Sequence, residues 1–133
     1  MPFVLDNSVV AGWFLEDQAS PYTEAIARQL EGDRAIVPPL WQLEFANVLR
    51  TACRKQRLIA SQAHEVVEQV CGLPIEIDPV TPGPAELLAL ALRYDLSGYD
   101  AAYLELALRR QLPIATKDGP LREAAMTSGV GLA

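Results

Sequence analysis

Residues 3–8, Phe3-Val4-Leu5-Asp6-Asn7-Ser8, carry the pattern on which the rest of the chain is built. The short apolar run is typical of a buried strand, and the polar residues after it are typical of a helix start. Further strand-like runs at 35–37, 74–79 and 113–116 alternate with helix-like segments, at 9–16, 20–30, 40–57, 61–70, 84–94, 99–110 and 121–127. This alternation predicts an α/β fold with three layers, in which helices flank a short, mostly parallel central sheet. A fifth strand over 130–132 is compatible with the pattern.

The composition is that of one globular domain. The chain has 133 residues, half of them hydrophobic and 21% charged, so we expect a single domain over residues 1–133 and no disordered tail. The formal net charge is −6, from 17 acidic and 11 basic residues. This balance is unfavourable for a protein that grips a nucleic acid duplex, which usually presents a basic surface.

The cysteines and the hydropathy indicate where the protein works. Cys53, Cys71 and the single histidine, His64, have no spacing that matches a zinc site, so we interpret the thiols as reduced. The apolar run at 87–92 is much shorter than the roughly 20 residues that span a bilayer, and no targeting segment is evident. We therefore expect a cytoplasmic protein without a membrane partner.

Four acidic residues are candidates for a functional site. Asp6 follows the first predicted strand and Asp118 follows the fourth, and sites of parallel sheets form at the carboxyl ends of their strands. Glu44 and Asp100 lie in predicted helices. Each acid also has a structural interpretation, since Asp6, Asp100 and Asp118 occupy helix-start positions where they could act as caps, and Glu44 could be a solvated side chain.

Convergence of the four carboxylates would require a positive charge. Two carboxylates 4 Å apart repel each other by about 4 kcal/mol at an effective dielectric constant of about 20. Oxygen ligands without a well-placed Cys or His select hard cations such as Mg²⁺ or Mn²⁺.

Four stretches of the chain, in order, resemble the motif blocks of the PIN domain family. They are Val4-Leu5-Asp6-Asn7-Ser8, Glu44-Phe45-Ala46-Asn47-Val48-Leu49, Tyr99-Asp100-Ala101-Ala102-Tyr103-Leu104-Glu105-Leu106-Ala107 and Ala115-Thr116-Lys117-Asp118-Gly119-Pro120-Leu121. In size the chain is most similar to the VapC toxins of prokaryotic toxin–antitoxin pairs, which are single PIN domains. The resemblance implies a Mg²⁺- or Mn²⁺-dependent endoribonuclease that hydrolyses RNA phosphodiester bonds.

The resemblance also assigns roles to individual residues. Asp6, Glu44, Asp100 and Asp118 match the acidic quartet of the family, and Asp6 and Asp100 match its most frequent direct metal ligands. Ser8, Thr116 and Asn47 match polar positions that support these ligands or bound water.

Partners follow from the same resemblance. It implies a VapB-like antitoxin that places a basic side chain in the acidic pocket, and a homodimer. The chain's own bases offer an RNA contact, since Arg50, Arg54, Lys55 and Arg57 cluster after Glu44, although a solvated helix end explains them equally well.

Two other functions are open at the level of sequence. A PIN-like module could bind RNA or protein without turnover. A receiver-like domain could accept a phosphoryl group on Asp78, with Lys117 as the lysine that this class has near a late strand, but that class needs paired acids after the first strand and only Asp6 is present.

Overall fold

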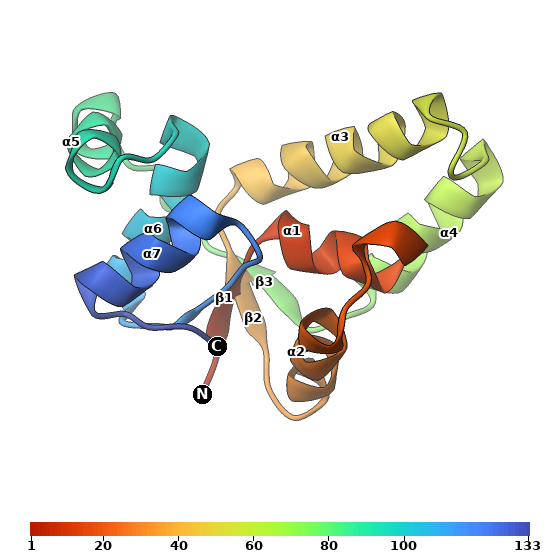
Figure 1. The fold of residues 1–133 in the computed structure, drawn as a ribbon, viewed down its shortest axis with the longest axis horizontal. Helices are drawn as coiled ribbons and strands as arrows, with labels where there is room; N and C mark the ends of the chain where they lie inside the picture. The colour runs from red at the N-terminus through yellow and green to blue at the C-terminus, as the bar shows by residue number, and fades with distance from the viewer.

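A four-stranded sheet lies at the centre of the protein, for which the computed structural model describes residues 1–133 (Figure 1). Every neighbouring pair of strands is parallel, and the strand order is β3-β2-β1-β4. In chain order, the elements are β1 (Phe3–Leu5), α1 (Asn7–Val10), the 3₁₀ turns η1 (Ala11–Trp13) and η2 (Glu16–Gln18), α2 (Pro21–Glu31), β2 (Ala35–Val37), α3 (Leu40–Arg54), α4 (Ala60–Cys71), β3 (Ile75–Ile77), α5 (Pro84–Tyr94), α6 (Gly98–Arg110), β4 (Ile114–Ala115) and α7 (Gly119–Ser128).

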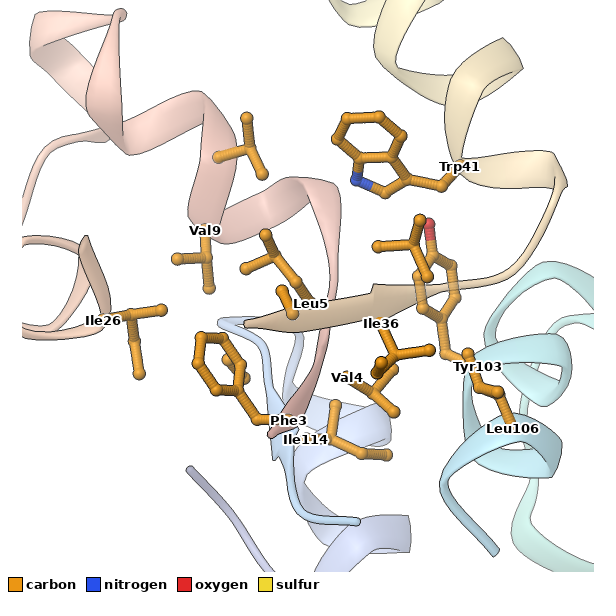
Figure 2. Packing of buried hydrophobic residues seen from close by; sticks show 14 of the residues in the cluster. Phe3, Val4, Leu5, Val9, Ile26, Ile36, Trp41, Tyr103, Leu106 and Ile114 are labelled. Carbon is orange, nitrogen blue, oxygen red and sulfur yellow. The ribbon is translucent and has the colours of Figure 1, made fainter. Parts of the chain in front are cut away.

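Alternating side chains of the strands fill the space on both faces of the sheet. Val4 lies in register with Ile36 and Ile114, and Figure 2 shows this row on the side of α6. Phe3 points to the opposite side, toward Ile26 of α2. All residues of β1, β2 and β4 are fully buried, which explains why these strands are apolar throughout. The predicted three-layer α/β/α arrangement is confirmed.

The strand order places a crevice at the end of β1. The chain adds β2 and β3 on one side of β1 and then adds β4 on the other side. In open parallel sheets, ligands bind outside the carboxyl ends of the strands where the order reverses in this way. The segments that follow β1 and β4 therefore flank the place where a site is expected.

Three local predictions differ from the structure. The helix predicted over 9–16 is one α-helical turn and a 3₁₀ turn, because contacts with α2 determine this segment: the Trp13 Nε1 group donates a hydrogen bond to the Thr23 carbonyl oxygen at 2.8 Å. The helix predicted over 40–57 ends at Arg54, since Gln56 adopts a left-handed conformation. Residues 130–132 form one isolated bridge to β4 and no strand.

β3 differs from the other strands because it forms the edge of the sheet. Glu76 and Ile77 are exposed, and only Ile75 is half-buried. α5 has no buried residue, although it is rich in leucine and alanine. No helix of the structure combines the length and the apolar composition that crossing a membrane requires.

Gly12 provides a test of how η1 packs on α2. A Cβ atom at this position would lie 2.5 Å from Thr23 Cγ2, and Thr23 is fully buried. We predict that Gly12→Ala lowers the free energy of unfolding by about 1–3 kcal/mol, because the added methyl group overpacks the core. Urea unfolding followed by circular dichroism measures this change.

Gly32→Ala is the matched control, since a Cβ atom at Gly32 meets nothing within 4 Å. Its urea midpoint should stay close to that of the wild type. Equal midpoints for Gly12→Ala and Gly32→Ala would contradict the packing of η1 against Thr23.

Candidate active site

Asp6 is the centre of a hydrogen-bond cluster between β1 and β4. Its carboxylate is 8% exposed, and its Oδ2 atom accepts hydrogen bonds from the hydroxyl groups of Ser8 and Thr116, each at 2.7 Å. Asp6 begins α1, but its side chain makes no capping hydrogen bond. The cap interpretation of this residue is therefore wrong, and no hydrogen bond occupies its Oδ1 atom.

The two hydroxyl groups are themselves oriented by the backbone of the 116–118 segment. Ser8 Oγ accepts a hydrogen bond from the Lys117 N–H at 2.9 Å, and Thr116 Oγ1 accepts one from the Asp118 N–H at 3.1 Å. Each hydroxyl has a single proton, which it donates to Asp6. The Arg122 guanidinium donates to the Thr116 carbonyl oxygen at 2.8 Å and so holds the same segment from α7.

Glu44 reaches the site from the first turns of α3. Its Oε1 atom accepts a hydrogen bond from the Tyr103 hydroxyl at 2.6 Å, so the side chain is half-buried and is not a solvated surface group. Burial raises the pKa of the Glu44 carboxyl, the Tyr103 hydrogen bond opposes the rise, and the charge of Asp6 adds to it. Glu44 is therefore close enough to Asp6 to be affected by its charge.

Asp100 lies in the first turn of α6. Ser97 caps this helix, and the Asp100 N–H donates to the Ser97 hydroxyl oxygen at 3.1 Å. The capping role therefore falls on Ser97. Burial raises the pKa of Asp100 to about 6, the negative charges of Asp118, Asp6 and Glu44 add to the rise, and the Ser97 hydroxyl group opposes it.

Asp118 caps a helix and also lies close enough to Asp100 to affect its pKa. It is the N-cap of α7, and its Oδ2 atom accepts a hydrogen bond from the Leu121 N–H at 3.0 Å. The cap prediction is confirmed for this residue. Its Oδ1 atom is left without a hydrogen bond, so capping does not consume the whole carboxylate.

Together the four acids form an electrostatic cluster without forming a closed ligand cage. Each carboxylate keeps at least one oxygen free of hydrogen bonds, and Asp100 is influenced by the other three. No three His, Cys, Asp or Glu side chains lie close enough together to ligate an ion. The free donors are carboxylate oxygens, which suit a hard divalent cation. Such a cation would also offset the repulsion that raises the pKa of Asp100.

The other residues selected from the sequence lie outside this cluster. Asn47 is exposed and makes no hydrogen bond. Arg50, Arg54 and Lys55 are exposed and form no ion pair, whereas Arg57 pairs with Asp17. A helix rises 1.5 Å per residue, so Arg54 lies about 15 Å along α3 from Glu44.

Asp78 belongs to a separate, saturated ion network at the end of β3. It is 3% exposed and accepts hydrogen bonds from Arg109, Arg110 and the Val80 N–H. Arg109 also pairs with the buried Glu105 at 2.7 Å. These contacts argue against a receiver-like phosphoacceptor, because the Asp78 carboxylate is enclosed by guanidinium groups. The Lys117 ammonium group donates to the Gln18 carbonyl oxygen instead.

Sequence analysis missed Tyr103 and Arg122 as residues of the site. Tyr103 stands three positions after Asp100, a spacing that puts both on one face of a helix. That spacing was visible in the sequence, but the partner of the hydroxyl group on α3 was not. Nothing near Arg122 in the sequence indicates its bond to the Thr116 carbonyl oxygen.

Comparisons with known proteins agree with this geometry. The family model described as PIN domain matches residues 3–126. Ribonuclease VapC12 of two Mycobacterium tuberculosis strains is 29% identical over 121 residues, which cover 91% of this chain and 90% of that protein. The crystal structure of PAE2754 from Pyrobaculum aerophilum superposes with a TM-score of 0.73 at 19% identity, covering 93% of this chain and 84% of that chain.

The raised pKa of Asp100 predicts a pH-dependent stability of the metal-free protein. Folding moves this pKa from about 4 to about 6, so the contribution of the Asp100 carboxyl to stability is fully present below pH 4 and is lost as pH rises through 6. Asp100→Asn cannot ionise, so it does not lose this stability as pH rises. Two pKa units correspond to at most about 3 kcal/mol, and solvent screening of the partly exposed side chain reduces the effect to about 1 kcal/mol.

Melting temperatures in EDTA at pH 4 and pH 7 measure the effect. The melting temperature of Asp100→Asn should exceed that of the wild type by about 4 °C more at pH 7 than at pH 4. Asp95→Asn is the control, because Asp95 is exposed and has a left-handed backbone that asparagine also adopts. An equal difference in melting temperature between Asp100→Asn and the wild type at both pH values would contradict the electrostatic coupling of the acids.

Proposed function

The chain belongs to the PIN domain family, and on this premise we propose that residues 1–133 form a single Mg²⁺- or Mn²⁺-dependent endoribonuclease domain, the toxin of a VapBC-type pair. The observation that carries the proposal is the electrostatic cluster of four acids, each with a free oxygen. Asp6 and Asp118 follow β1 and β4, and Glu44 and Asp100 lie on α3 and α6. The similarity to Ribonuclease VapC12 supports RNA as the substrate.

In this proposal, Asp6 and Asp100 hold the cation. Asp6 offers its Oδ1 atom, because Ser8 and Thr116 keep the Oδ2 atom occupied and the carboxylate oriented. A bound Mg²⁺ or Mn²⁺ ion would lower the pKa of a water molecule and supply a nucleophile near neutral pH.

Asp118 and Glu44 complete the site. Asp118 orients water through its free oxygen while its other oxygen caps α7. Glu44 is a ligand or a proton acceptor, and burial favours its protonated form more than in an exposed glutamate. The buried Tyr103 hydroxyl remains a donor, because burial and the Glu44 carboxylate raise its pKa.

The partners proposed for this domain are RNA, an antitoxin and a second copy. Exposed apolar side chains support protein partners: Leu43 is 74% exposed, Leu88 59% and Leu92 75%. A basic antitoxin side chain would neutralise the acids in place of a cation. We further propose that the protein acts in the cytoplasm, where its RNA substrates are.

The nuclease proposal predicts that Asp6→Asn and Asp100→Asn each lower Mn²⁺-dependent RNA cleavage about 100-fold or more, because each removes a charged ligand. Gel assays with single-stranded RNA, with purified protein free of antitoxin, measure the rates. EDTA should abolish cleavage by the wild type.

Asp95→Asn serves as the control and should cleave at the wild-type rate. Cleavage that persists in Asp6→Asn and Asp100→Asn would point to a contaminating nuclease and remove the assignment. RNA binding by the wild type with no cleavage of tRNA, rRNA or mRNA would favour a catalytically silent binding module.

The free bases of α3 give a separate prediction about RNA binding. Arg54→Gln should raise KM for single-stranded RNA about threefold at low salt and leave kcat unchanged, because a cation that contacts phosphate contributes a salt-dependent attraction. Arg28→Gln is the matched control, since Arg28 is an exposed arginine of α2 without an ion pair. Equal KM values for the two variants would assign Arg54 to a solvated helix end.

A further inference from the structure

Tyr103 has an unusual place for a polar group. It is fully buried, and it is the largest of the fully buried side chains. Figure 2 shows its ring beside Ile36, with the hydroxyl group pointing away from α6 toward the helix that carries Trp41. The residue thus spans the core from α6 to α3.

The hydroxyl group of Tyr103 forms a hydrogen bond with Glu44. It donates to the Glu44 Oε1 atom at 2.6 Å, across 59 positions of sequence. A phenylalanine would fill the same apolar space without the cost of burying a hydroxyl group. Packing therefore accounts for the ring of Tyr103 but not for its oxygen, which has its partner in the acidic cluster.

This hydrogen bond joins two of the helices that carry the acids. Tyr103 lies one helical turn after Asp100 on α6, and Glu44 belongs to α3. A second hydrogen bond attaches α1 to α3, where the Asn7 Nδ2 group donates to the Trp41 carbonyl oxygen at 3.2 Å. The free oxygen of Glu44 is its Oε2 atom, because Tyr103 occupies Oε1.

We propose that Tyr103 is a positioning residue of the acidic site, which holds Glu44 by one oxygen so that the other is presented to a divalent cation. The inference rests on the proposed function and deepens it, since it adds a residue that acts through Glu44. Tyr103 itself touches neither cation nor RNA in this arrangement.

Calorimetric titration with Mn²⁺ tests the inference without an activity assay. Tyr103→Phe removes only the hydroxyl group and should weaken Mn²⁺ binding about 10- to 100-fold, the range found when a support of a metal ligand is lost. Tyr22→Phe is the matched control, because the Tyr22 hydroxyl also donates a hydrogen bond, to the Ala133 carbonyl oxygen at 3.3 Å. It should leave Mn²⁺ binding unchanged.

A double-mutant cycle with Glu44→Gln separates positioning from a general effect on the fold. The glutamine can still accept the Tyr103 hydrogen bond but lacks the charge. Adding Tyr103→Phe to Glu44→Gln should therefore weaken Mn²⁺ binding less than twofold. A further drop as large as in the wild-type background, or unchanged binding in Tyr103→Phe alone, would overturn the inference.

A measurement on the unmodified protein covers the case that Tyr103→Phe does not fold. Saturating Mg²⁺ should shift the proton NMR resonance of the Tyr103 hydroxyl group, because the cation withdraws charge from Glu44. A resonance that does not move would overturn the inference. Weakened Mn²⁺ binding in Tyr103→Phe, together with a wild type that cleaves no RNA, would support the inference and remove the nuclease proposal. A wild type that binds no Mn²⁺ would remove both.

Discussion

The pair of hydrogen bonds on the Asp6 carboxylate is the constraint on which the rest of the site depends. Ser8, which follows β1, and Thr116, which follows β4, donate to one oxygen of Asp6. Because the backbone of residues 117 and 118 in turn donates to these hydroxyls, the end of β1 and the end of β4 form one unit. This unit fixes one oxygen of Asp6 and leaves the other available.

The remaining acids are attached to this unit by means other than their own charges. Glu44 is held by Tyr103, Asp118 by its cap on α7, and Asp100 by the helix that Ser97 starts. The protein therefore uses hydrogen bonds and packing to keep like charges near one another. Burial raises the pKa of Asp100 and of Glu44, and the nearby negative charges add to both rises. The carboxylates of such a cluster repel one another until a cation or a basic side chain neutralises their charge.

Much of this arrangement could be predicted from the sequence, and the limits have physical causes. Short apolar runs identified the four strands, and helix caps such as Ser97 and Asp118 had recognisable positions. Contacts between distant segments left no local signal. The Tyr103 hydrogen bond to Glu44 and the shortening of the helix at 9–16 by Thr23 both depend on neighbours that only the folded chain supplies. The alternative roles of Asp6 and Asp100 were undecided in the sequence for the same reason.

The bond between Thr116 and Asp6 joins residues 110 positions apart and has a consequence for synthesis. Chains are made from the N-terminus, and closing so long a loop requires both of its ends. A growing chain exposes Asp6 and Glu44 early, but the support of Asp6 arrives only when Thr116 has left the ribosome. In the proposed nuclease, the hydrogen bond that orients Asp6 therefore cannot form before Thr116 has been translated.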